Sequence, residues 1–161
     1  MSDQAKQTET GTGWAVGSLD GIGEGPGFRK IRNELDVKEF GVNAIVMPAG
    51  YGAGMHWHDE QEELYFVHSG QIEITFGDGS KHSLGAGGLA RVDAATPRAV
   101  SNPGEVEAVY VVVGGKGGYV GRDGRSPEGV NPRAQAEDTN PDHDGQHGKG
   151  GANPAEADAQ L

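Results

Sequence analysis

The sequence contains no cysteine among its 161 residues, which excludes disulfides, thiolate metal sites and cysteine nucleophiles. Basic residues are also scarce, because 13 lysines and arginines stand against 24 acidic residues and give a net charge of −11. This charge repels phosphate backbones and anionic lipid, so we expect neither nucleic acid nor a membrane surface as a partner. No apolar run approaches the roughly 20 residues of a membrane-spanning helix, and residues 1–13 lack the apolar core of a signal peptide. We therefore expect a cytoplasmic protein.

Apolar side chains are few and unevenly spread. Hydrophobic residues make up 34% of the chain and aromatic residues 6%, whereas 29 residues are glycine. Residues 1–13 carry no branched aliphatic or aromatic side chain, and residues 121–161 have only Val130 and Leu161 as large aliphatic ones. Such segments cannot bury enough apolar area to offset the entropy of ordering. We predict a disordered arm over residues 1–13, one domain over residues 14–120, and a disordered, acidic, Gly/Pro-rich tail over residues 121–161.

Within the predicted domain the apolar residues follow a strand pattern. Residues 71–76 (QIEITF) alternate between apolar and polar side chains, as expected for a half-buried strand. Residues 40–47 (FGVNAIVM) and 106–113 (VEAVYVVV) are short apolar runs bounded by turn residues, and only residues 33–38 have a helical pattern. Many short strands separated by turns indicate an all-β sandwich or small barrel.

Residues able to perform chemistry gather between Gly50 and Gly70. His56 and His58 are two positions apart, so on a strand both side chains point to the same face. Glu63 opens the following strand and can face the same interior. Two imidazole nitrogens and one carboxylate form the ligand set that leaves open positions on non-haem iron. We therefore predict that all three bind a metal, and counting by twos places Tyr65 on the same face as a substrate-binding residue.

This stretch resembles the first motif of the cupin family, Gly-x5-His-x-His-x4-Glu-x6-Gly. Gly50, His56, His58, Glu63 and Gly70 stand at its five fixed positions. The resemblance implies a cupin-like double-stranded β-helix, that is, a jelly-roll β-barrel that holds a divalent ion (Fe, Mn, Ni or Zn) in its mouth. It also implies pairing into a homodimer through sheet edges or swapped N-terminal strands.

The sequence departs from the second cupin motif, Gly-x5-Pro-x-Gly-x2-His-x3-Asn. Gly87 and Asn102 are in place, but Asp93 and Ala95 replace the proline and the glycine. Arg98 stands where the family has its fourth metal ligand. Arginine stays charged and has no lone pair to donate, so Arg98 is not a ligand. At about 6 Å and an effective dielectric near 20, it would repel a divalent ion by roughly 5 kcal/mol.

Two arrangements of this site stay open. In the first, the site holds no metal and Arg98 pairs with Glu63. In the second, the metal remains on its three ligands while Arg98 binds an anionic substrate, a task that suits the planar guanidinium. Cupins allow three or four residues before the acidic ligand, so Glu62 is an alternative to Glu63. The other four histidines are not expected to bind a metal; they are His68, His82, His143 and His147.

Three functions are compatible with these observations. The first is a small-molecule-binding cupin with a metal site, working as a metal-dependent enzyme of the oxygenase or isomerase type on a small anionic substrate. The second is a non-catalytic, metal-free module that binds a ligand or acts as a sensor, which the altered second motif favours. The third is a structural or storage role, for which the short chain and single motif set offer least support.

Overall fold

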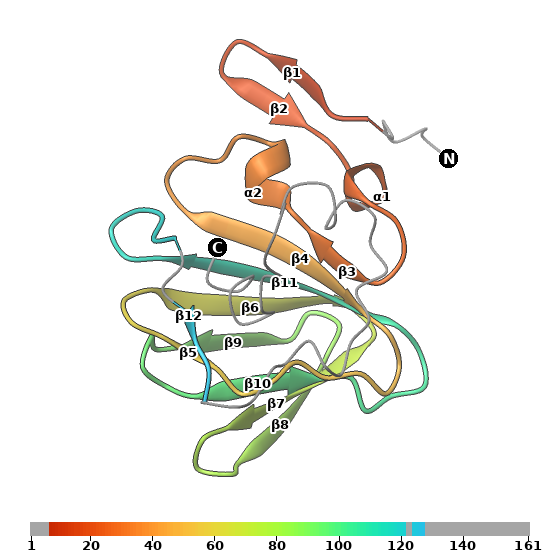
Figure 1. Cartoon of the computed structure of the whole chain (residues 1–161). Helices are drawn as coiled ribbons and strands as arrows, with labels where there is room; N and C mark the ends of the chain where they lie inside the picture. Colours follow the sequence, from red (N-terminus) through yellow and green to blue (C-terminus); the bar gives the residue numbers. More distant parts are fainter. Residues whose placement is uncertain (1–6, 122–123, 128–161) are drawn as a thin grey trace.

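The architecture is the predicted all-β jelly roll, described by a computed structural model over residues 7–121 and 124–127. Two antiparallel sheets pack against each other, with the five-stranded sheet above the three-stranded one in Figure 1. The five-stranded sheet has the spatial order β3 (Gly27–Arg29), β4 (Gly41–Met47), β11 (Ala108–Gly115), β6 (Glu62–Ser69) and β9 (Leu89–Val92). The three-stranded sheet has the order β10 (Arg98–Ser101), β7 (Gln71–Phe76) and β8 (Lys81–Gly85).

Alternating side chains of both sheets build the core. Along β6 every second residue is buried, and Tyr65 and Val67 are fully enclosed while Phe66 and His68 face outward. Ile72 and Ile74 of β7 meet them from the opposite sheet, each with no exposed surface. The period-two pattern of the sequence therefore selects the interior face of each strand, including the face that carries Glu63.

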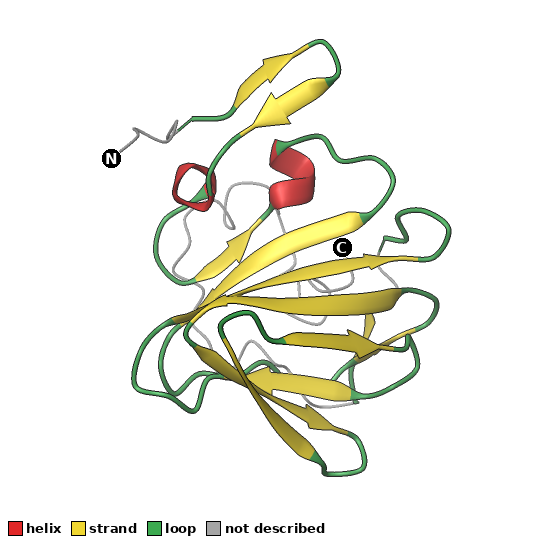
Figure 2. Cartoon of the chain, turned by 180° about the vertical axis from the view of Figure 1, so that it is seen from behind, coloured by secondary structure: helices red, strands yellow, loops and turns green. Residues whose placement is uncertain are grey.

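Strand β4 is buried along its whole length because both of its faces are covered. Its inner face joins the core, and two short helices, α1 (Leu19–Ile22) and α2 (Ile31–Glu34), lie on the outer side in Figures 1 and 2. The predicted helix at residues 33–38 is thus misplaced. The chain turns at Asp36, which adopts a left-handed φ of 54°, so α2 ends before it. None of the helices in the described part of the chain has the length and apolarity needed to span a membrane.

Each of the two segments predicted to be disordered contains one short strand. Strands β1 (Glu9–Gly11) and β2 (Trp14–Val16) form a hairpin, so the prediction of an unstructured arm over residues 1–13 is wrong for residues 9–11. Gly13 supplies the positive φ that a two-residue hairpin turn requires. Strand β12 (Gly124–Arg125) likewise pairs with β5 (Trp57–His58), assisted by an Arg125–Asp59 ion pair. The remainder of the predicted arm and tail, residues 1–6, 122–123 and 128–161, lies outside the described residues.

Turn residues of the two sequence motifs have structural roles. Gly50 and Gly70 both adopt a positive φ, of 77° and 71°, which favours glycine because it has no Cβ. The Asn102 side chain donates to the carbonyl oxygens of Met47 at 3.0 Å and Val106 at 2.8 Å, and accepts from the Gly104 amide at 3.0 Å. This asparagine therefore ties the end of β4 to the loop between β10 and β11.

Candidate metal centre

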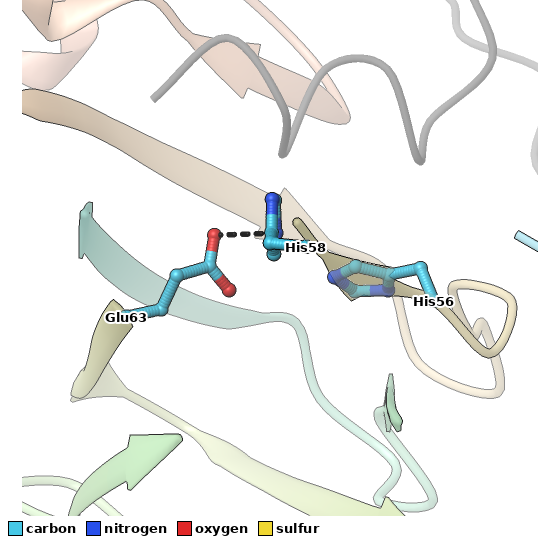
Figure 3. Close-up of side chains that lie close together, drawn as sticks. All are labelled: His56, His58 and Glu63. Atoms are coloured by element: carbon cyan, nitrogen blue, oxygen red, sulfur yellow. Dashed lines mark ion pairs between the residues drawn. The ribbon is translucent and has the colours of Figure 1, made fainter. Parts of the chain in front are cut away.

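His56, His58 and Glu63 meet inside the barrel (Figure 3), each with at most 1% of its surface exposed. The segment that carries the histidines runs antiparallel to β10, where the backbones of His56 and Arg98 exchange two hydrogen bonds of 2.9 Å. Extended backbone here turns both imidazoles inward and leaves Trp57 between them on the opposite side. The ligating atoms of the three residues all lie within 4.8 Å of one another. The structure thus brings together the three residues predicted as ligands.

The rival carboxylate lies outside this group. Glu62 precedes Glu63 on β6, so its side chain points away from the barrel, where it pairs with Arg91. Its side chain is 55% exposed, whereas that of Glu63 has no exposed surface. His68 and His82 are also exposed on strands β6 and β8, away from the site, while His143 and His147 lie outside the described residues.

Glu63 is held ionised by three donors. Its Oε1 lies 3.0 Å from His58 Nε2, and its Oε2 accepts hydrogen bonds of 2.6 Å from both Tyr65 Oη and Arg98 Nη2. Burial by itself would raise the pKa of this carboxyl. The hydrogen bond from His58 and the positive charge of Arg98 outweigh burial and lower the pKa of Glu63 to about 2. The site therefore contains a buried, negatively charged oxygen pair.

Arg98 is a buried charge with many partners. Besides Glu63, it donates from Nη1 to the carbonyl oxygens of Ala94 at 3.1 Å and Thr96 at 2.9 Å, and from Nε to Tyr65 Oη at 3.3 Å. Burial would lower the pKa of this guanidinium, but the neighbouring Tyr65 and Glu63 raise it, so it stays charged. The Arg98–Glu63 pair is the pairing that one of the two open arrangements predicts.

The two imidazoles have different hydrogen-bond partners on their Nδ1 atoms. His56 Nδ1 lies 3.2 Å from the Gly54 carbonyl oxygen, which can only accept, so His56 carries its proton on Nδ1 and presents a lone pair on Nε2. His58 Nδ1 instead lies 3.1 Å from the amide nitrogen of Gln61, which can only donate. His58 therefore carries a proton on Nε2, which lies 3.0 Å from Glu63 Oε1. A metal at Nε2 would require the opposite tautomer and a turned Gln61 amide.

Gln61 is the site residue that the sequence did not reveal. It lies in the polar run 59–62, yet its side chain has no exposed surface. Nothing in the composition of this run distinguishes Gln61 from its acidic neighbours. Its position three residues after His58 is a weak signal, because only the fold of the turn decides which polar side chain points inward.

The donor set fits a divalent ion. Two imidazole nitrogens and a carboxylate suit zinc, iron, manganese or nickel, and ligands bound at about 2.1 Å lie up to roughly 4.2 Å apart. The separation of at most 4.8 Å between the ligating atoms is close to that limit. His56 is already oriented for coordination, whereas His58 and Glu63 are engaged with each other and with Arg98.

A family model described as a cupin domain matches residues 43–114, the span from β4 to β11 that contains all of these residues. This chain contains a cupin domain. Similar solved structures include a cupin protein from Bacteroides fragilis, with 23% identity, 72% of this chain and 86% of that chain covered, and a TM-score of 0.52. A second is a sugar phosphate isomerase of the cupin superfamily from Silicibacter pomeroyi. It has 24% identity and a TM-score of 0.51, and the match covers 59% of this chain and 69% of that chain. No curated protein matches the chain.

Proposed function

We propose that this cupin domain binds a divalent metal ion through His56, His58 and Glu63 and binds a small anionic molecule next to it. The observation that carries the proposal is the burial of two imidazoles and an ionised carboxylate with their ligating atoms within 4.8 Å. Two imidazoles and an ionised carboxylate that converge in this way can give a metal three directed bonds. Nothing in the donor set distinguishes Fe, Mn, Ni and Zn.

The chemistry follows from what surrounds the ligands. A bound ion would supply Lewis acidity, or oxygen activation if it were iron. The chain itself contributes a phenol at Tyr65 and a guanidinium at Arg98, both buried and within hydrogen-bond distance of Glu63 Oε2. When an anionic substrate enters, Arg98 can exchange part of its contact with Glu63 for the substrate, and Tyr65 can hold a substrate oxygen. A metal-dependent oxygenase or isomerase is the enzyme class that we propose.

The activity of one structural relative does not narrow the substrate of this chain. That protein is named as a sugar phosphate isomerase, but at 24% identity the likeness extends to the fold. The small anionic substrate is therefore proposed from the charge of Arg98 alone.

A metal-free binding module is the second candidate. It is favoured by the hydrogen bonds that Arg98 already makes within the protein. The guanidinium already compensates Glu63 at 2.6 Å, and Arg98 stands at the motif position where cupins have another histidine ligand. In that case the barrel would bind a small molecule without catalysis, and Glu63 and Arg98 would form a structural ion pair.

Metal titration of chelator-treated full-length protein separates the two candidates. We expect one equivalent of Zn²⁺, Mn²⁺, Ni²⁺ or anaerobic Fe²⁺ to bind, and His56→Ala to weaken binding at least tenfold. His82→Ala is the matched control, because His82 lies on β8 against the Phe76 ring and should leave affinity unchanged. Absence of binding at millimolar metal in the wild type would reject the metal centre and leave the binding module. Equal effects of both substitutions would place the ion elsewhere.

We also propose a homodimer that pairs at the β6–β9 side of the five-stranded sheet. Phe66 and Leu89 are register partners on the outer face of these strands, and they are 40% and 60% exposed. Leu64 is 42% exposed on the same face of β6, and β9 ends the order of this sheet. Covering such a patch is a common reason for association. Light scattering should give a dimer mass that Phe66→Glu reduces to a monomer. The cytoplasmic location and the exclusion of nucleic acid and membrane stay predictions.

A further inference from the structure

A cavity of about 920 Å³ lies on the outer face of the five-stranded sheet, away from the metal centre. Val46 of β4 and Val109 of β11 line it, whereas their chain neighbours Ile45 and Tyr110 belong to the core inside the barrel. The N-terminal segment with α1 and α2 forms its other wall. Its volume is in the range of small-molecule sites.

Arg29, the last residue of β3, lines this cavity and is buried, with 5% of its surface exposed. Its Nη2 donates to the Gly25 carbonyl oxygen at 2.8 Å. Within the described part of the chain, its buried Nε and Nη1 atoms have no hydrogen-bond partner. Arg98, equally buried, satisfies its nitrogens with a carboxylate and two carbonyl oxygens. A permanently charged guanidinium with unsatisfied donors in a cavity wall is costly unless a ligand supplies the missing acceptor.

The remaining lining defines the kind of acceptor. Half of the non-glycine side chains that line the cavity with Arg29 are aliphatic: Leu19, Ile22, Ile31, Leu35, Val46 and Val109. Ser18, His68 and Ser69 add neutral polar groups or an imidazole to the lining. Three carboxylates, Asp20, Glu24 and Glu107, also line the cavity and are exposed to solvent. They would repel a phosphate dianion about twice as strongly as a singly charged carboxylate, since the Coulomb energy scales with charge.

We propose that this cavity is a second ligand site, which binds a small organic monocarboxylate. Its carboxylate accepts hydrogen bonds from Arg29, and its apolar body packs against the aliphatic wall. Gly25 and Gly27, with φ of 65° and 114°, let the preceding loop fold back onto the guanidinium and form one side of the site. The site is independent of the metal centre, so it stands whether or not His56 and His58 bind an ion.

Calorimetric titration of the full chain after metal removal tests the proposal. The probes are hexanoate and benzoate, with hexanamide as the neutral analogue of hexanoate and inorganic phosphate as the dianion. We expect both carboxylates to bind at least tenfold more tightly than hexanamide or phosphate. Removal of metal prevents binding of the probes to the other centre from being counted here.

Two matched variants assign the binding to Arg29. Arg29→Met should weaken hexanoate binding at least tenfold. Arg32→Met is the control, because Arg32 lies on α2 with its guanidinium 3.9 Å from the centre of the Tyr119 ring, and should change affinity less than twofold. Without ligand, Arg29→Met should melt no lower than the wild type, since the substitution removes an uncompensated buried charge.

Several results would overturn the proposal. One is equal affinity of wild type and Arg29→Met for hexanoate, which would place the carboxylate elsewhere. Another is equal affinity for hexanoate and hexanamide, which would mean that the charge is not recognised. No binding of any carboxylate at 10 mM (about ten times the Kd of a weak ligand near 1 mM) would remove the site. A large loss of stability in unliganded Arg29→Met would show that Arg29 serves the fold instead.

Discussion

Replacing Arg98 by methionine should destabilise the metal-free protein and strengthen its binding of metal. The substitution removes one partner of a fully buried pair and leaves the Glu63 carboxylate, with no exposed surface, without its 2.6 Å partner. Breaking such a pair costs about 3–5 kcal/mol. For a domain of this size that corresponds to a fall in Tm of roughly 12–20 °C, at about 4 °C per kcal/mol.

The chain offers a matched control in Arg91. It also pairs with carboxylates, Glu62 and Asp93, but its side chain is 59% exposed. Exposed pairs are screened by solvent and contribute little, so Arg91→Met should lower Tm by no more than about 4 °C. Both variants remove one positive charge, so the difference between them isolates the effect of burial.

Metal should rescue the Arg98→Met variant more than it stabilises the wild type. A divalent ion on His56, His58 and Glu63 returns positive charge to the carboxylate, and the repulsion from Arg98, roughly 5 kcal/mol at about 6 Å, is gone. We expect at least tenfold tighter binding by calorimetry, and tighter still for Arg98→His, which adds a neutral nitrogen ligand.

Thermal unfolding followed by circular dichroism, with and without metal, gives both halves of the test. If Arg98→Met melts within about 4 °C of the wild type, as Arg91→Met should, then the buried pair does not stabilise the fold. If Tm falls but neither Arg98 variant binds metal more tightly, Arg98 does not face the ion, and the electrostatic argument is wrong.

Three further predictions concern single residues of the barrel. Because the pKa of Glu63 is lowered from 4.5 to about 2, its contribution to stability is present above pH 4.5 and is lost as the pH falls toward 2, on the order of 3 kcal/mol in all. Urea unfolding of wild type and Glu63→Gln should therefore give free energies that converge over this range; parallel curves would contradict the assignment. Gln61→Leu should weaken metal binding about tenfold. It should also abolish the preference of His58 for the Nε2–H tautomer, which ¹⁵N NMR would measure. An unchanged tautomer would exclude a role of Gln61 in orienting His58. Gly70→Ala should lower the free energy of unfolding by about 1 kcal/mol or more, the cost of an unfavourable backbone conformation. Gly70 has a φ of 71°, and the added Cβ would lie 2.6 Å from the Glu107 carbonyl oxygen. An unchanged stability would mean that this turn relaxes.

The sequence by itself determined the strand pattern and the inward set of residues. Side chains alternate across a strand, so once Glu63 faces the interior, Tyr65 must as well, and Glu62 must face solvent. The spacing of His56 and His58 gives them the same face for the same reason. These are local consequences of extended backbone, and the family resemblance added the closure of the strands into a jelly-roll barrel.

Only the tertiary structure decided the contacts between distant segments. Arg98 lies 35 residues after Glu63, and its pairing with Oε2 depends on how β10 packs beside the histidine segment. The burial of Gln61 depends on the fold of one polar turn, and the cavity at Arg29 depends on where the N-terminal helices settle on the outer sheet face. Composition cannot encode such positions, because the charge state and partners of a buried polar group are set by whichever segments the fold brings against it.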